Sequence, residues 1–323
     1  MEQETGLQVF YSDTFTIPLP EGHRFPITKY RRLRERIEQS SCTESCSLQL
    51  APPASLQELC LAHEQEYVER ALEGRLEKLE VRRIGFPWSS ALMERSRRST
   101  GATLEACRQA LQGNTYAVNL AGGTHHASAS QGQGFCVFND SAVASLTMLA
   151  EQRCQRVLIV DVDVHHGNGT ASILQDVPEV LTFSIHGANN FPLHKPDSDI
   201  DIGLPDGTGD NDYLLALKEG LSLAFERAKP ELVIVLAGAD PYKGDRLGKL
   251  ALSRQGLARR DEMVFDFADV VDAAVVVVMA GGYAPDVEDI VDIHFQTVRE
   301  AFSRHQKRRS RHSFTSPSGK QAR

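Results

Sequence analysis

The chain has 323 residues, of which 41% are hydrophobic and 24% are charged, and its formal net charge is -8. This composition is typical of a globular protein with a sizeable core, and the acidic balance excludes a chain-wide basic surface for gripping nucleic acid. The longest apolar run, AAVVVVMA at residues 273–280, is too short to cross a membrane and is typical of a buried strand.

The first part of the chain is predicted to be helical between loops. The Pro/Gly-rich stretch PLPEGHRFP indicates a loop, and KYRRLRERI after it indicates a charged helix. The Ser/Pro-rich residues 42–53 are predicted to be a connection. A helix is predicted over 55–79, because Ser55 and Glu58 have the spacing of a capping box. An amphipathic helix is predicted over 96–112.

From there on, short β-branched runs alternate with helical segments. The five runs are TYAVNLAGG, RVLIVDVD, VLTFSIHG, ELVIVLAGAD and AAVVVVMAGGY. Helices are predicted over 139–151, 169–174, 210–228, 253–268 and 286–303, with a long loop before the third of them. Strands that are apolar on both faces and separated by helices indicate a parallel sheet covered on both sides. We therefore predict an α/β fold, with a single domain over residues 1–304 and a central, mostly parallel sheet flanked by helices on both faces.

The remaining residues, 305–323, read HQKRRSRHSFTSPSGKQAR and are basic, Ser-rich and poor in apolar residues. This composition predicts a disordered tail, and we expect no specific nucleic-acid binding from it. The six cysteines are scattered and the acidic start MEQETG is unlike a secretory signal, so we expect reduced thiols and a cytoplasmic protein.

Polar side chains stand at the end of every predicted strand. In chain order they are His125 and His126, then Asp161, Asp163 and His165, then Ser184 and His186, then Asp240, and finally Tyr283. Ligands bind in the crevice outside the carboxyl ends of the strands of an open parallel sheet. Because several strands deliver such groups to one edge, the pattern predicts a functional site there.

Part of this set has the composition of a metal site. Side chains alternate along a strand, so Asp161, Asp163 and His165 are expected to share a face. Two buried aspartates require a cation or hydrogen-bond donors. Asp163 and His165, with the distant Asp240, would supply three ligands and leave a fourth position open, as in catalytic zinc sites. The alternative is that these residues only support a structural edge.

The sequence resembles the zinc-dependent histone deacetylases of the arginase/deacetylase superfamily. The matching blocks, in family order, are AGGTHHA (121–127), GFCVFNDSAVA (134–144), VDVDVHHGNGT (160–170), FSIH (183–186), AGADPYKGDRLG (237–248) and AGGY (280–283). PLPEGHRFPITKYRRLRER near the start is similar to the bacterial branch of the family and to its class IV type. The resemblance implies the arginase/deacetylase fold.

The resemblance also implies two metal ions. Asp163, His165 and Asp240 would bind Zn²⁺, which polarises the amide carbonyl and lowers the pKa of water. A structural K⁺ would lie beside it. Its ligands would be Asp161, Ser184 and the main-chain carbonyls of Asp163, His165 and Ile185.

The remaining implied roles concern proton transfer. His126 would act first as general base and then as general acid. His125 would be an electrostatic histidine oriented by Asp161. Tyr283 would donate a hydrogen bond to the developing oxyanion. Asn168 stands where class I enzymes carry an aspartate, so it would orient His126 without adding a negative charge.

The substrate implied by the resemblance is an acyl-lysine side chain of a protein or peptide. Gly134 and Phe135 would line the channel that accepts this side chain, and Phe191 would form the opposite wall. Leu247 stands where the polyamine-selective branch carries a glutamate, and the loop 82–90 lacks the aspartate that grips substrate backbone in class I enzymes.

Three alternatives stay open at this point. A small-molecule amidohydrolase acting on acetylamines or acetylpolyamines would share the same chemistry. A non-catalytic acyl-lysine binding module predicts the loss of a zinc ligand or of Tyr283, and all of these residues are present. A binuclear arginase-like hydrolase would need further aspartates, of which the sequence offers Asp245. The acyl group itself, acetyl or longer, is left open.

Overall fold

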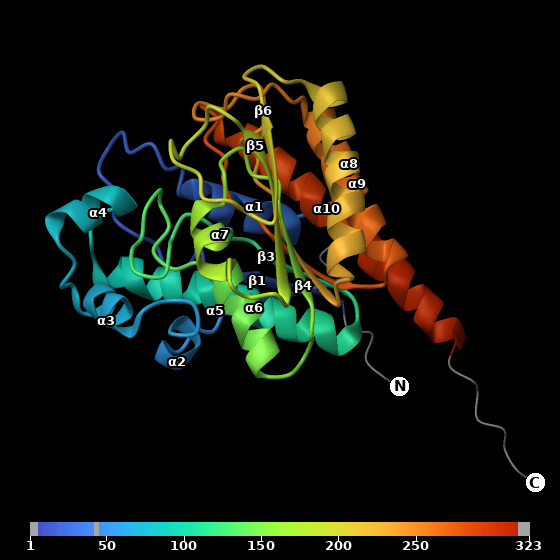
Figure 1. Ribbon diagram of the computed structural model, residues 1–323, viewed down its shortest axis with the longest axis horizontal. Coiled ribbons are helices and arrows are strands. Elements are labelled where there is room, and N and C mark those ends of the chain that lie inside the picture. Colours follow the sequence, from blue (N-terminus) through green and yellow to red (C-terminus); the bar gives the residue numbers. More distant parts are fainter. Residues whose placement is uncertain (1–5, 42–44, 316–323) are drawn as a thin grey trace, which may run out of the picture.

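A single sheet of eight parallel strands forms the centre of the molecule (Figure 1). The computed structural model describes residues 6–41 and 45–315. The strands are β1 (Leu7–Tyr11), β2 (Cys46–Leu50), β3 (Tyr116–Asn119), β4 (Val157–Asp161), β5 (Val180–Gly187), β6 (Ile200–Leu204), β7 (Leu232–Leu236) and β8 (Ala274–Val278). Their order is β2-β1-β3-β8-β7-β4-β5-β6, and every pairing between them is parallel. The predicted α/β fold with a parallel sheet is confirmed.

Helices cover both faces of this sheet. They are α1 (Thr28–Glu38), α2 (Leu56–Leu59), α3 (Gln65–Glu73), α4 (Lys78–Ile84), α5 (Ser90–Gly113), α6 (Asp140–Ala150), α7 (Asn168–Leu174), α8 (Asp210–Ala228), α9 (Arg254–Val270) and α10 (Val287–Thr315). Figure 1 shows α8, α9 and α10 on one side of the sheet and α5 and α6 on the other. Within the described residues, none of these helices combines the length and apolarity needed to span a bilayer.

Strand β8 shows how the sequence builds the two layers. Its valines are β-branched residues that favour a strand, and all are fully buried. Because side chains alternate along a strand, Val275 and Val277 pack into the core beneath α8, α9 and α10, whereas Val276 and Val278 pack against α5 and α6. Each buried valine contributes roughly 1.5–3 kcal/mol of hydrophobic stabilisation. This double burial explains why the central strands are apolar along their whole length.

Two predictions for the N-terminal part are wrong. The segment 42–53, predicted to be a connection, contains the edge strand β2, which pairs with β1. The single helix predicted over 55–79 is three short helices. The capping box is confirmed, since Glu58 N donates to Ser55 Oγ and Ser55 N donates to Glu58 Oε2. The break after α3 occurs at Gly74, whose φ of 75° is the left-handed conformation that ends helices.

The C-terminal helix also differs from the prediction. Helix α10 continues to Thr315, so residues 305–315 are not the start of a disordered tail. Two of its polar side chains are buried in contacts that a tail would not make. His305 Nδ1 lies 2.8 Å from Thr115 Oγ1, and Arg308 Nη1 donates to the carbonyl of Ala273 at 2.6 Å. The rest of the predicted tail, 316–323, lies outside the described residues.

Candidate active site and metal centre

The three proposed zinc ligands meet at the carboxyl edge of the sheet. Asp163 and His165 follow β4, and Asp240 follows the neighbouring strand β7. Their ligand atoms all lie within 4.8 Å of one another, and each residue is at least nine-tenths buried. His165 Nδ1 is 3.0 Å from Asp163 Oδ1 and 3.2 Å from Asp240 Oδ2. The structure therefore brings together an imidazole and two carboxylates from segments 75 residues apart in the chain.

This donor set fits a divalent transition-metal ion. Asp240 Oδ2 is buried and accepts no hydrogen bond from any described residue, although buried polar atoms are normally satisfied. Gly281 leaves the space open, since a Cβ there would lie 1.9 Å from Asp240 Oδ2. Three protein ligands of N and O type with room for a fourth ligand are the arrangement of a catalytic metal site.

The pKa values in this group are also compatible with metal binding. Burial, together with repulsion from Asp163, raises the pKa of Asp240 to about 7. Burial by itself lowers the pKa of His165, but the nearby carboxylates of Asp163 and Asp240 raise it to about 10. At neutral pH these interactions favour a proton on His165, which a metal ion would displace on binding.

The adjacent histidines His125 and His126 lie next to this group with different partners. His125 Nδ1 is 2.6 Å from Asp161 Oδ2, and His126 Nδ1 is 2.7 Å from Asn168 Oδ1. Their ring centroids are 4.1 Å apart, and that of His126 is 5.8 Å from that of His165. The expected pairings of the two histidines are therefore both present in the structure.

The partners give the two imidazoles different charges. Burial by itself lowers the pKa of His125, but the carboxylates of Asp161 and Asp163 raise it to about 9. Burial lowers the pKa of His126 well below its usual value, and the neighbouring His125 lowers it further. At neutral pH, His125 is therefore cationic and His126 is neutral.

Tyr283 also lies near the metal group, on the loop after β8. Its ring centroid is 6.3 Å from that of His165 and 5.9 Å from that of Phe135. Its backbone N–H donates to Asp245 Oδ2 at 2.6 Å, so this carboxylate holds the loop that carries the hydroxyl. Burial raises the pKa of Tyr283 well above 10, and the nearby Asp240 and Asp163 raise it further. The phenol therefore stays protonated as a hydrogen-bond donor.

Asp245 does not supply a second metal position. Its Oδ1 accepts hydrogen bonds from the backbone N–H groups of Leu247 and Gly248 at 2.8 and 2.9 Å. Together with the hydrogen bond from the Tyr283 backbone, these contacts show that Asp245 stabilises the loops around it. Among the described residues, it belongs to neither group of side chains that could hold a metal ion.

A cavity of about 420 Å³ leads to the metal group. His126, His165 and Tyr283 line it, and so do the four predicted channel residues, Gly134, Phe135, Phe191 and Leu247. Gly134 has a φ of 57°, and a Cβ there would lie 2.6 Å from the ring of His126. Only glycine allows this approach. The ring of Phe191 stands edge-on to that of His126, with centroids 4.9 Å apart.

The rim of this cavity is basic. Arg24, Arg82, Arg83 and Lys249 line it, and no Asp or Glu of the described residues does. These cations come from the loop before α1, from α4 and from the loop after β7, so their convergence is not visible in the sequence. Leu247 and the absence of an aspartate in loop 82–90 are visible in the sequence, but this concentration of positive charge is not.

Three further polar residues support the site and were not singled out from the sequence. Asp140 accepts hydrogen bonds from the N–H groups of Gly123 and Thr124 at 3.1 and 2.7 Å, just before the tandem histidines. Lys195 Nζ donates to the carbonyls of Ala188, Asn190 and Pro192, which closes the loop that carries Phe191. Arg260 of α9 is fully buried and donates to the carbonyls of Val162 and Gly238. Helical periodicity alone places Arg260 on the core side of α9, but it does not identify these acceptors.

The proposed potassium ligands lie on adjacent strands. Asp161 of β4 and Ser184 of β5 are paired in the sheet register, and Ile185 follows directly. Ser184 Oγ is 3.0 Å from His186 Nδ1. The structure therefore brings the two side chains into neighbouring positions.

Comparisons with known proteins agree with this geometry. A model of the histone deacetylase domain family matches residues 23–298, which include the whole candidate site. An uncharacterized protein of Picosynechococcus sp. is 41% identical over 292 residues, covering 90% of this chain and 96% of its own length. The histone deacetylase-like amidohydrolase of Pseudomonas aeruginosa is 32% identical over 289 residues, covering 83% and 74%. The crystal structure of an HDAC homolog from Aquifex aeolicus is 25% identical with a TM-score of 0.79, covering 93% of this chain and 84% of that one.

Proposed function

Because the chain belongs to the histone deacetylase family, we propose that it is a zinc-dependent hydrolase that removes acyl groups from lysine side chains of proteins. The observation that supports this most directly is the convergence of three features on one cavity. The group formed by Asp163, His165 and Asp240 lies beside a neutral histidine and a protonated tyrosine, at a cavity with a glycine in its wall.

The chemistry follows from the protonation states of the chain's own residues. Zn²⁺ held by Asp163, His165 and Asp240 would polarise the amide carbonyl and lower the pKa of water. His126 Nδ1–H donates to Asn168 Oδ1, so the Nε2 lone pair is the base that takes a proton from the attacking water. The hydroxyl of Tyr283 donates to the oxyanion as the tetrahedral centre forms. His126 then returns its proton to the lysine nitrogen, the C–N bond breaks, and a carboxylate and an amine leave.

The cationic partner His125 contributes by charge. Its imidazolium, held by Asp161, lies beside the centre where negative charge develops. It also lowers the pKa of His126, so the base stays neutral at neutral pH. The two histidines thus divide electrostatic stabilisation and proton transfer between them.

The basic rim favours protein substrates over acetylpolyamines. Arg24, Arg82, Arg83 and Lys249 would repel the free ammonium groups of a polyamine, and Leu247 offers no carboxylate to attract them. An acyl-lysine is neutral, so it enters the cavity without this repulsion. Acidic residues flanking the acyl-lysine in a protein would be attracted by the same four cations.

We propose that K⁺ binds at Asp161 and Ser184, with the main chain of Asp163, His165 and Ile185. Its support is the pairing of Asp161 with Ser184 across β4 and β5. Dialysis against a sodium- and potassium-free buffer, with activity then followed as KCl is added, tests this site. A dependence on K⁺ that Ser184→Ala weakens is the expected result.

The main test compares substrates and metal dependence on purified protein. Hydrolysis of acetyl-, crotonyl-, lactyl- and myristoyl-lysine peptides, with acidic or basic flanking residues, is measured beside hydrolysis of acetylpolyamines. We expect turnover of acyl-lysine peptides, fastest with acidic flanks, that a chelator abolishes and Zn²⁺ restores. Asp163→Ala and Asp240→Ala should lose the active-site zinc and the activity, and Asp206→Ala, which removes an exposed carboxylate, should keep both.

Three outcomes would contradict parts of this proposal. Activity that resists chelation would overturn the metal mechanism. Preferred hydrolysis of acetylpolyamines would overturn the substrate class. Tight binding of acyl-lysine peptides without turnover of any of them would favour the non-catalytic module.

The oxyanion role of Tyr283 predicts a specific kinetic defect. Tyr283→Phe removes the hydroxyl and keeps the ring against Phe135, so kcat should fall by about 10²–10³ while bound zinc is unchanged. Tyr242→Phe, on a tyrosine outside the cavity, is the matched control and should keep wild-type kcat. Full activity of Tyr283→Phe would remove this residue from the mechanism.

A further inference from the structure

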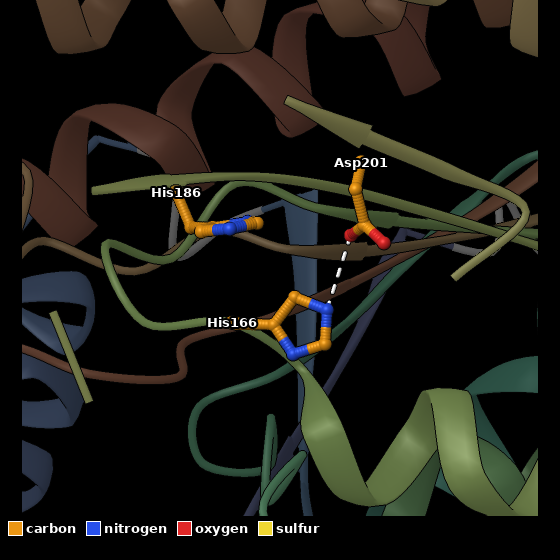
Figure 2. Close-up of side chains that lie close together, drawn as sticks. All are labelled: His166, His186 and Asp201. Atoms are coloured by element: carbon orange, nitrogen blue, oxygen red, sulfur yellow. Dashed lines mark ion pairs between the residues drawn. The ribbon is translucent and has the colours of Figure 1, made fainter. Parts of the chain in front are cut away.

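A second group of potential metal ligands lies outside the active site. It consists of His166, His186 and Asp201, whose ligand atoms all lie within 4.8 Å of one another. In Figure 2 the carboxylate of Asp201 points at the ring of His166, and the imidazole of His186 extends toward the same space. His166 Nε2 is 3.1 Å from Asp201 Oδ1, and the two imidazole centroids are 4.8 Å apart. Neither histidine is among the catalytic residues predicted from the sequence.

The sheet explains why these three residues meet. His166 follows β4 directly after the proposed ligand His165, while His186 belongs to β5 and Asp201 to the edge strand β6. Asp201 is paired with Ser184, two residues before His186, so Asp201 and His186 are diagonal neighbours on the same face. Three consecutive strands of the sheet thus each contribute one side chain or the residue that follows it.

The burial of the group suits an ion that enters from solvent. His166 is fully buried and His186 is 3% exposed, whereas the side chain of Asp201 is 29% exposed. Two imidazoles and a carboxylate are a typical donor set for Zn²⁺ and related divalent ions. The exposed carboxylate gives the ion a path in, and the fourth position can hold water.

The outer contacts of the ligands are compatible with binding through both Nε2 atoms. Ser184 Oγ holds His186 at Nδ1, which leaves its Nε2 available. His166 Nδ1 makes no hydrogen bond with any described residue, so no donor there prevents the proton from moving to Nδ1 and freeing Nε2. Ser198 N donates to Asp201 Oδ2 at 2.7 Å, which orients the carboxylate and leaves Oδ1 facing His166.

We propose that His166, His186 and Asp201 form a second site that binds a divalent transition-metal ion, with Zn²⁺ as its ion. Bound there, Zn²⁺ ties the edge strand β6 to β5 and to the segment after β4 that also carries His165. The site is structural, and it does not depend on the proposed deacylase activity.

Metal stoichiometry tests the proposal independently of activity. The full chain is stripped with a chelator, titrated with Zn²⁺ in competition with a chromophoric chelator, and analysed for bound zinc after desalting. We expect two zinc ions per wild-type chain and one in Asp201→Asn. His186→Asn should also bind one, and its amide can keep the contact with Ser184 that His186 Nδ1 makes.

Two further variants separate this site from the active site. Asp206→Asn removes a neighbouring exposed carboxylate that pairs with Lys249, and it should still bind two ions. Asp240→Asn removes a proposed active-site ligand and should bind one, so the Asp240→Asn, Asp201→Asn double variant should bind none. An Asp201→Asn chain that binds as many zinc ions as the wild-type chain would overturn the second site. Failure of the deacylase proposal would instead appear as absent turnover, whatever the zinc count.

Discussion

At the scale of single residues, the protonation states in the candidate site depend on which side chains lie next to each other. His125 and His126 are adjacent and identical in type, yet one has a raised pKa and the other a lowered pKa. The difference arises because a carboxylate, Asp161, faces the first and an amide, Asn168, faces the second. A neutral partner thus keeps His126 in the basic form that proton transfer requires.

This pairing makes a prediction for the pH dependence of catalysis. In Asn168→Asp, the new carboxylate stabilises the imidazolium, so the pKa of His126 rises. The base must be neutral to accept a proton, so activity is lost as pH falls through this pKa. The acid limb of kcat/KM should therefore move to higher pH by the same amount, while the bound zinc stays unchanged.

The control for this experiment is Asn189→Asp, which adds the same charge at a cavity-lining residue that makes no hydrogen bond with His126 in the structure. It should leave the acid limb close to its wild-type position. An acid limb that is the same in Asn168→Asp and wild type would show that His126 is not the titrating base.

At the scale of elements, helix α9 holds the two ligand-bearing segments together. Arg260 donates to the carbonyl of Val162, next to Asp163, and to that of Gly238, two residues before Asp240. Its charge is balanced by Asp261, which also accepts from Thr297 Oγ1 of α10. One buried guanidinium therefore links β4, β7 and two helices behind the metal group.

We predict that Arg260→Met is destabilised by about 3–5 kcal/mol, because it leaves Asp261 as a buried charge without its partner and two carbonyls without donors. Its affinity for zinc should fall as well, since the two ligand segments lose their common support. Urea unfolding and zinc competition measure the two effects. Arg259→Met, on the exposed face of the same helix, should stay within about 0.5 kcal/mol of wild type. Equal stability of the two variants would show that Arg260 does not hold these segments together.

At the scale of the whole molecule, the C-terminal helix closes the layer on one face of the sheet. Helix α10 packs on α1, on α9 and on β3, and its last buried contacts come after residue 304. Arg308 pairs with Asp269 at 2.6 Å and lies over the ring of Tyr116, with 4.6 Å to its centroid. These contacts make the end of α10 part of the domain.

A chain that ends at residue 304 is therefore expected to lose about 3 kcal/mol of unfolding free energy, because Asp269 loses one of its two arginine partners and the carbonyl of Ala273 loses its donor. A chain that ends at residue 315 keeps all of α10 and should match the full chain. Thermal and urea unfolding of the two truncations measure the difference. Equal midpoints would show that the end of the helix contributes nothing.

The sequence by itself predicted the sheet and the residues at its edge. The five central strands are recognisable because burial on both faces requires continuous apolar runs. Polar residues after such strands must meet at one edge whatever the strand order, since all carboxyl ends of a parallel sheet point the same way. For this reason the sequence alone places five residues at this edge: His126, Asp163, His165, Asp240 and Tyr283.

Strands β1, β2 and β6 were not predicted. The edge strands β2 and β6 are short and partly exposed, and they lack the continuous apolar runs of the central strands. β1 is apolar and largely buried, but it has only five residues. The alternation of Asp and Ile at 199–202 is the signal that indicates β6. Without β6, the sequence does not predict that Asp201 lies beside His166 and His186.

Only the tertiary structure decided the pairings between distant segments. They include the different partners of His125 and His126, the hydrogen bonds of Arg260 to two distant carbonyls, the four cations of the rim and the second group of metal ligands. Strand and helix periodicity is encoded within a few neighbouring residues, so the sequence carries it locally. Which charge faces which carboxylate depends on how the packed layers bring together residues that are tens of positions apart, and the folded chain alone determines that.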